Sequence, residues 1–244
     1  MLELLNQLRL QALAVQLPTL LDEARQQQLS YEAFLQRVLT VERDGRQQRA
    51  LERRCRAARL PLAVRLETFD FSFQPSLSER LVHELAGLSF LQTATNVVLL
   101  GPPGVGKTHL ACGLALKALE GGQSVLFTSL RELAGRLASR SERPDAVLRR
   151  YSQPKLLIID EVGYTRLSQE QAQALFELVT ARYERSSVIL TSNLSFAEWG
   201  ALLGDDVLAT ALLDRLLHHA EVISINGRSY RMRQRMAADQ SRAA

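Results

Sequence analysis

Gly101-Pro102-Pro103-Gly104-Val105-Gly106-Lys107-Thr108 is the stretch of this 244-residue chain that decides its fold. It fits the eight-position pattern of a phosphate-binding loop, in which spaced glycines are followed by Lys and then by Ser or Thr. The glycines let backbone N–H groups close around phosphate oxygens, while Lys107 supplies a cation and Thr108 offers a hydroxyl to Mg²⁺. A glycine-proline turn can match the same pattern by chance, so the flanking sequence has to decide.

The flanks of the loop favour a nucleotide site over a chance turn. Residues 96–100, an asparagine followed by four apolar side chains, predict a buried strand that enters the loop. Residues 108–120 predict a helix whose N-terminal dipole faces the anion, and His109 in its first turn is a further candidate for nucleotide contact. We therefore expect a nucleotide phosphate and Mg²⁺ at this site.

More apolar runs alternate with helical patterns beyond the loop. The expected strands cover residues 124–128, 156–160, 188–191 and 221–225. This alternation predicts an α/β fold with a parallel, doubly wound sheet, right-handed crossovers and ligands at the carboxyl ends of the strands.

Polar residues stand at the carboxyl ends of two of these strands. Asp160 and Glu161 follow the strand at 156–160, and Asn193 follows the strand at 188–191. We expect Asp160 to hold Mg²⁺ through its water shell and Glu161 to orient or deprotonate the attacking water, with Asn193 bonding the γ-phosphate or that water. The alternatives are ordinary solvent-facing acids and a turn asparagine.

The chain before the loop predicts a separate helical and basic domain, residues 1–65, ahead of a nucleotide-binding domain at 66–244. Leucines at helical spacing predict a first helix over 2–17 that stops before Pro18, and Ser30 is the expected N-cap of a second helix. Residues 66–77 are expected to form an extended linker, and its phenylalanines can wall one side of an adenine pocket.

Charge is unevenly distributed, although the whole chain carries only +4 at pH 7. Both ends are basic, and residues 43–65 hold eight arginines against Asp44 and Glu52. This stretch predicts either an exposed helical arm that contacts DNA or a solvated connector.

Two distant cysteines, Cys55 and Cys112, without partners at metal spacing, argue against a disulfide scaffold or a zinc site and favour a reducing cytosol. Residues 1–20 lack the apolar core of a secretory segment, and no apolar run has the length of a membrane span. We expect a cytoplasmic protein without a membrane partner.

Together with residues 212–219 and 229–231, the motifs above resemble the IstB-like family of AAA+ ATPases. These are transposition helper proteins of bacterial insertion sequences, related to DnaC-type helicase loaders and to the initiator DnaA. The resemblance is close from about Phe69 to Arg233. It implies a P-loop AAA+ core and an ATPase that forms a homo-oligomer on duplex DNA, deforms the DNA and recruits a transposase.

The resemblance also assigns roles to several arginines. Arg215 matches the arginine that such proteins insert into the ATP site of the neighbouring subunit. The alternative is a surface salt bridge of Arg215 with Asp214 or another neighbour. Arg231 is a weak candidate for a phosphate sensor, because no C-terminal helical lid is expected.

Residues 130–150 occupy the place of helices that face nucleic acid in initiator-type relatives, with a mobile exposed loop as the alternative. The expected DNA contacts are Arg49, Arg53, Arg54, Arg56, Arg136, Arg140, Arg149 and Arg150.

Three other functions remain open at this point. A replicative helicase loader of the DnaC type would share the ATPase core and prefer single-stranded DNA. A small-molecule kinase would use the same phosphate loop, but Glu161 and Asn193 suit water activation and the basic segment would have no role. A nucleotide-binding scaffold without turnover is disfavoured by Glu161.

Overall fold

A computed structural model describes residues 1–61, 64–139, 141–230 and 232. The chain divides into two compact units, Met1–Arg54 and Cys55–Ala244. The domain boundary expected at residue 65 stays a prediction. Helix α3 continues past the division between the units and ends at Ala58.

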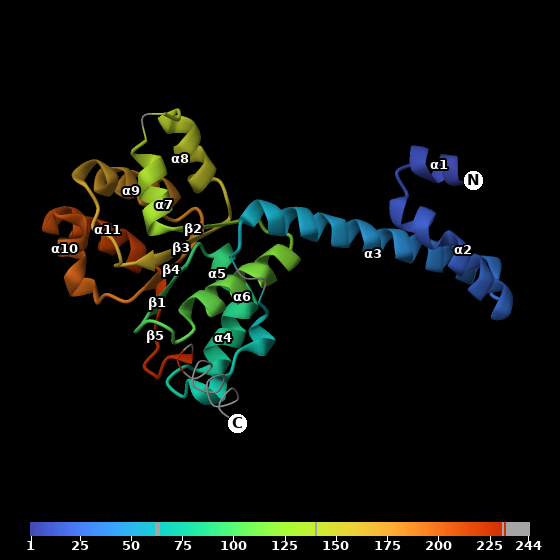
Figure 1. Ribbon diagram of the computed structural model, residues 1–244, viewed down its shortest axis with the longest axis horizontal. Helices are drawn as coiled ribbons and strands as arrows, with labels where there is room; N and C mark the ends of the chain where they lie inside the picture. The colour runs from blue at the N-terminus through green and yellow to red at the C-terminus, as the bar shows by residue number, and fades with distance from the viewer. Residues whose placement is uncertain (62–63, 140, 231, 233–244) are drawn as a thin grey trace, which may run out of the picture. The chain divides into compact units, whose positions relative to one another are not determined.

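The first unit contains the helices α1 (Leu2–Gln7), α2 (Gln11–Gln26) and most of α3 (Tyr31–Ala58) (Figure 1). The helix expected over 2–17 was wrong, because the chain turns at Arg9 and Pro18 lies inside α2. A proline inside a helix removes one hydrogen bond. Burial of the leucines on both sides of it offsets this loss, since one apolar cluster joins Leu5, Leu13, Leu17, Leu20 and Val38.

The segment before the sheet is more ordered than the expected extended linker. It forms two short 3₁₀ turns, η1 (Leu66–Thr68) and η2 (Phe71–Phe73). The side chain of Asp70 accepts a hydrogen bond from the backbone N–H of Phe73 and caps the second turn. Helices α4 (Glu79–Ala86) and α5 (Ser89–Gln92) then lead into the sheet.

The second unit is built on a parallel sheet of five strands in the order β2-β3-β4-β1-β5. All five expected strands are present, each within two residues of its predicted ends. Their bounds are β1 (Asn96–Leu100), β2 (Val125–Ser129), β3 (Leu156–Val162), β4 (Ser187–Ser192) and β5 (Ala220–Ser224). Since β1 pairs with β4, the loop after β1 lies beside the ends of β4 and β3.

Helices cover both faces of the sheet, as Figure 1 shows, so the doubly wound α/β prediction is confirmed. Helix α6 (Lys107–Glu120) packs on one face together with α4. The other face carries α7 (Leu130–Leu137), α8 (Pro144–Ser152), α9 (Gln169–Arg182) and α11 (Asp206–Leu217), with the short η3 (Phe196–Glu198) and α10 (Trp199–Leu203) beside them. The largest apolar cluster lies on this second face and includes Leu157, Leu190 and Trp199.

Most of the described residues of 130–150 lie in the two helices α7 and α8, in place of the mobile loop considered above. Ser129 caps α7 by accepting from the N–H of Glu132, and Pro144 occupies the first turn of α8. Leu133 and Val147 are buried in the large cluster. Burial of these apolar side chains therefore holds the segment on the sheet.

Two further expectations concern membrane-spanning helices and a C-terminal lid. Across the described residues, no helix combines the length and apolarity needed to cross a membrane. The predicted absence of a C-terminal lid concerns residues 233–244, which together with Arg231 lie outside the described residues.

Candidate nucleotide site

A cavity of about 480 Å³ opens at the carboxyl ends of β1, β3 and β4. Its lining combines the phosphate-loop residues 103–108 with His109 and with the polar ends of the two neighbouring strands. The residues from those strands are Asp160, Glu161, Thr191, Ser192 and Asn193. The sheet order thus brings the sequence-predicted site residues from three separate segments to one cavity.

The phosphate loop has the backbone conformation that its glycines permit. Gly106 has φ of +103°, and it is the N-cap of α6, so the loop ends where the helix dipole begins. A Cβ atom at Gly106 would lie 2.6 Å from the ring of Phe69. Glycine is therefore required at this position both by conformation and by space.

Lys107 lies over the loop that it belongs to. Its ammonium group donates to the backbone carbonyls of Gly101 at 2.6 Å and Pro102 at 2.8 Å. Thr108 follows in the first turn of α6, and its hydroxyl lies 3.1 Å from both carboxylate oxygens of Asp160. The loop and the end of β3 are thus directly joined by hydrogen bonds.

Thr191 near the end of β4 joins the two acids of β3. Its hydroxyl donates to Oδ1 of Asp160 and accepts the backbone N–H of Glu161 at 3.1 Å. Asp160 is only 6% exposed, so these hydrogen bonds to hydroxyl groups replace the water that its carboxylate loses on burial. Thr191 was missed in the sequence, where it reads as one more β-branched strand residue.

Glu161 leaves the regular strand conformation. It has φ of +63°, and the pairing of β3 with β4 shifts register between Ile159 and Val162. A glutamate in the left-handed region is uncommon and costs conformational energy. The hydrogen bond from its N–H to Thr191 holds this bulge, which leaves the Glu161 side chain exposed at the cavity.

Asn193 lines the cavity just after β4. Its side-chain oxygen is buried and accepts no hydrogen bond from the residues that the structure describes. The oxygen lies close to Gly163, where a Cβ atom would come within 2.5 Å of it. Asn193 therefore presents a hydrogen-bond acceptor whose position is restricted by the glycine after β3.

Aromatic side chains form another part of the wall. Phe69 and Phe73 come from the segment before the sheet, and Tyr230 follows β5. The ring of Phe69 meets His109 edge-on at 5.4 Å, and the ring of Phe73 meets Tyr230 in the same manner. The expectation that this segment walls a pocket agrees with its position, whereas Tyr230 and the buried Gln74 were not predicted to line it.

Proteins of known families resemble the chain over nearly its whole length. The family model of the IstB-like ATP binding protein matches residues 3–238. The chain belongs to this family. It is 46% identical to an ATP-binding protein of insertion sequence IS21 from Pseudomonas aeruginosa, over 96% of this chain and 89% of the relative. It is 40% identical to the corresponding protein of insertion sequence IS5376 from Geobacillus stearothermophilus, over 96% and 94% of the two chains.

Solved structures share the fold of this IstB-like chain at low sequence identity. A crystal structure of DnaI has a TM-score of 0.57 and 19% identity, over 72% of this chain and 92% of that chain. The AMPPCP-bound DnaA from Aquifex aeolicus has a TM-score of 0.56 and 20% identity, over 68% and 51% of the two chains. The predicted AAA+ core is therefore confirmed at the level of the fold.

Arg215 lies on α11 and is absent from the lining of the cavity. Its guanidinium donates to the carbonyl of Ala211 at 3.0 Å and stacks 4.6 Å from the ring centre of Phe176 on α9. The described contacts thus place it between two helices of the second unit. Its expected role in a neighbouring site stays a prediction.

The arginines expected to contact DNA differ in their exposure and in their contacts within the IstB-like chain. Arg49 donates to the buried carboxylate of Glu42, which also accepts the backbone N–H of Leu13. Arg53 and Arg56 are exposed on α3, and Arg54 is half-buried. Arg149 is exposed on α8, while Arg150 lies 5.9 Å from the ring centre of Tyr151. Arg49 therefore has an internal structural partner.

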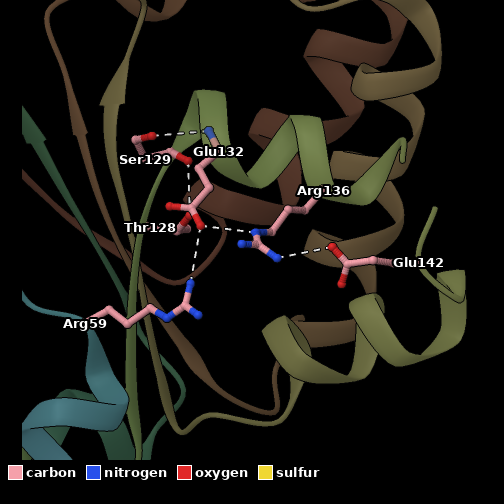
Figure 2. Close-up of polar contacts among 6 residues, drawn as sticks. All are labelled: Arg59, Thr128, Ser129, Glu132, Arg136 and Glu142. Carbon is pink, nitrogen blue, oxygen red and sulfur yellow. Dashed lines mark hydrogen bonds and ion pairs between the residues drawn. The ribbon is translucent and has the colours of Figure 1, made fainter. Parts of the chain in front are cut away.

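Arg136 belongs to a network of charges at the start of α7, drawn in Figure 2. Glu132 pairs with both Arg136 and Arg59, and Arg136 also pairs with Glu142. The carboxylates raise the pKa of Arg136, first through the hydrogen bond with Glu132. Arg136 is thus neutralised by two acids, and Arg140 lies outside the described residues.

Proposed function

We propose that this IstB-like protein binds and hydrolyses ATP, and that the bound nucleotide controls its assembly on duplex DNA and its recruitment of a transposase. The observation that carries the ATPase part is the hydrogen-bonded group of Thr108, Asp160 and Thr191 beside the phosphate loop. The relatives named as ATP-binding proteins of insertion sequences support the transposition part.

The chain's own groups suit a nucleoside triphosphate. The ammonium group of Lys107 can exchange its two carbonyl partners for phosphate oxygens, which are stronger acceptors because they are charged. The hydroxyl of Thr108 and the carboxylate of Asp160 are the hard oxygen donors that Mg²⁺ prefers, and they already lie side by side. When bound, Mg²⁺ would neutralise charge on the β- and γ-phosphates.

Two further residues support hydrolysis over mere binding. Glu161 is exposed at the cavity, where its carboxylate can orient or deprotonate a water molecule. The side-chain oxygen of Asn193, which has no hydrogen-bond partner among the described residues, can accept a hydrogen bond from that water. A transferred phosphoryl group attacked by a positioned water gives ADP and phosphate.

Arg215 is proposed to act on the nucleotide of a neighbouring copy. A guanidinium can neutralise charge that develops on the γ-phosphate, and its supply by another subunit makes hydrolysis depend on assembly. The position of Arg215 outside its own cavity is compatible with this role.

The ATPase proposal is tested by comparing Lys107→Ala with Glu161→Gln. We expect Lys107→Ala to abolish binding of a fluorescent ATP analogue, because the loop loses its cation. Glu161→Gln should still bind the analogue, release phosphate at least 100-fold more slowly, and remain longer on DNA. Turnover at the unmodified rate in Glu161→Gln would remove the glutamate from the reaction.

The proposed partners, duplex DNA and a transposase, are tested in separate experiments. We expect tighter binding to duplex than to single-stranded oligonucleotides in the presence of ATP, and stimulation of strand transfer by the transposase of the same element. A preference for single strands together with binding to a replicative helicase would instead establish the helicase-loader alternative.

A further inference from the structure

A second cluster of metal-binding side chains lies where the segments after α9 and α11 meet. It consists of Glu184, His218 and His219, none of which lines the nucleotide cavity. One atom from each side chain lies within 4.8 Å of the others. We propose that this Glu-His-His cluster is a binding site for a transition-metal ion of the zinc class, separate from the nucleotide site.

The distances between the ligand atoms suit one small ion. Oε1 of Glu184 lies 3.5 Å from Nε2 of His219 and 3.9 Å from Nδ1 of His218. Zinc binds imidazole nitrogen and carboxylate oxygen at about 2.0–2.2 Å, which separates tetrahedral ligands by about 3.3 Å. The two imidazole nitrogens lie within 4.8 Å of each other. Side-chain shifts of up to about 1.5 Å would bring the three ligand atoms to the tetrahedral spacing, and water would supply the fourth ligand.

The residue types select the class of metal. Two imidazoles and one carboxylate favour zinc and its neighbours in the transition series, whereas Mg²⁺ and Ca²⁺ prefer oxygen ligands alone. The side chains of Glu184, His218 and His219 are 55%, 52% and 51% exposed, so an ion can reach them from solvent. The site therefore does not compete with the nucleotide site for the same ion.

The backbone around the cluster is held by the first residue of β1. Asn96 donates from its backbone to the carbonyl of His219 and from its side chain to the carbonyl of Leu216. Its side-chain oxygen also accepts the N–H of Val188 in β4, four residues after Glu184. Both ligand-bearing segments are thus fixed to the same strand, which lowers the entropy cost of assembling the site.

Tyr183 is the internal competitor for the ion. Its hydroxyl is hydrogen-bonded to Nδ1 of His218, and its ring stacks on that imidazole. An ion bound at Nδ1 would displace this hydrogen bond. Removing the hydroxyl should therefore preserve or strengthen metal binding, while removing any of the three ligands should weaken it.

An ion at this place would join the ends of two helices that also hold Arg215. His218 follows the last residue of α11, three positions after Arg215, and the Phe176 ring under Arg215 belongs to α9. The bound ion would join the segment after α9 to the end of α11 that carries Arg215. The metal site itself does not depend on the proposed ATPase activity.

Titration of the full chain with ZnCl₂ by calorimetry, without nucleotide, tests the proposal. We expect one ion per chain and an affinity that falls on the order of tenfold or more in Glu184→Gln, His218→Ala and His219→Ala. His83→Ala is the matched control, because His83 also lies 3.5 Å from a glutamate, Glu79, but has one acidic partner in an exposed helical pair. Cys55→Ser controls for binding by a thiol.

The outcomes separate the site from adventitious binding. Unchanged affinity in Glu184→Gln and in the His218→Ala/His219→Ala double variant would overturn the proposal, as would an equal loss in His83→Ala or Cys55→Ser. Tyr183→Phe is expected to bind Zn²⁺ at least as tightly as the unmodified chain, and a tenfold loss there would contradict the assigned ligand set. Circular dichroism of every variant ensures that only folded chains are compared, and cobalt(II) absorption in the unmodified chain should show the strong visible bands of a tetrahedral site.

Discussion

At the residue scale, one threonine forms hydrogen bonds with both acids at the end of β3. The hydroxyl of Thr191 donates to the carboxylate of Asp160 and accepts from the backbone of Glu161. It therefore acts on a predicted metal ligand and on the backbone that presents the predicted base. Thr108 on the phosphate loop, by comparison, forms hydrogen bonds with the carboxylate of Asp160.

We expect Thr191→Val to lower kcat for ATP hydrolysis by about 10- to 100-fold, because both hydrogen bonds are lost while the shape of the side chain is kept. Affinity for ATP measured without Mg²⁺ should change little, and Thr191→Ser should restore most of the rate. Steady-state phosphate release checks this. The control is Thr128→Val, which removes a buried hydroxyl from β2, outside the cavity. Equal rates in Thr191→Val and the unmodified chain would show that Thr191 has only a packing role.

At the element scale, a buried arginine connects α8, β3 and β4. Arg182 at the end of α9 is 2% exposed and donates to the carbonyls of Tyr151, Ser152 and Pro154. It also donates to the carbonyl of Ser187 at the start of β4. Burial lowers its pKa to about 10, so it remains charged near neutral pH. These hydrogen bonds satisfy backbone groups at the amino ends of both strands.

We expect Arg182→Met to lower the free energy of unfolding by about 3 kcal/mol or more, since it leaves four carbonyls without their donor. The control is Arg185→Met, because Arg185 is exposed and lies three residues after Arg182. This variant should change the free energy of unfolding by no more than about 0.5 kcal/mol. Urea unfolding followed by circular dichroism measures both variants. If both variants lower the free energy of unfolding by the same small amount, water can replace the guanidinium of Arg182 as the donor to these carbonyls.

At the scale of the whole molecule, nucleotide chemistry and assembly are predicted to depend on one another. The cavity is lined by Lys107, by the predicted metal ligands Thr108 and Asp160, and by the predicted base Glu161, whereas Arg215 lies elsewhere on the same chain. If Arg215 serves a neighbouring copy, two variants with different defects can complement each other. The basic segments are predicted to bind DNA through phosphates, with little base preference.

We expect Arg215→Ala to bind ATP normally as an isolated chain but to hydrolyse it slowly and to lose ATP-dependent oligomers. Mixed with Lys107→Ala, it should recover part of the activity, because its intact cavity can receive the arginine of the Lys107→Ala neighbour. Phosphate release from defined mixtures measures this. If the two variants form mixed oligomers but phosphate release does not recover, Arg215 does not act in a neighbouring site.

We expect the slope of log affinity against log salt to flatten by about 0.9 for each phosphate contact removed from duplex DNA. Two variants test this, Arg53→Ala/Arg54→Ala/Arg56→Ala and Arg149→Ala/Arg150→Ala. Arg80→Ala is the control, since this exposed arginine pairs with Glu84 outside the basic segments. Unrelated duplexes should give equal slopes. If both variants keep the original slope, these side chains are solvated helix faces and not DNA contacts.

The sequence alone determined the phosphate loop, the five strands and the acids at the end of β3, because these features depend on local patterns of glycine, charge and apolar residues. Only the tertiary structure decided which distant side chains meet. The bonds from Thr191 to Asp160 and Glu161 require β4 to lie beside β3 with a register shift, and the Glu184 cluster requires the ends of α9 and α11 to converge. Pro18 shows the same limit, since burial of leucines in α2 outweighs a local helix-breaking preference. Contacts between residues about thirty positions apart follow from strand order and packing, which no local pattern contains.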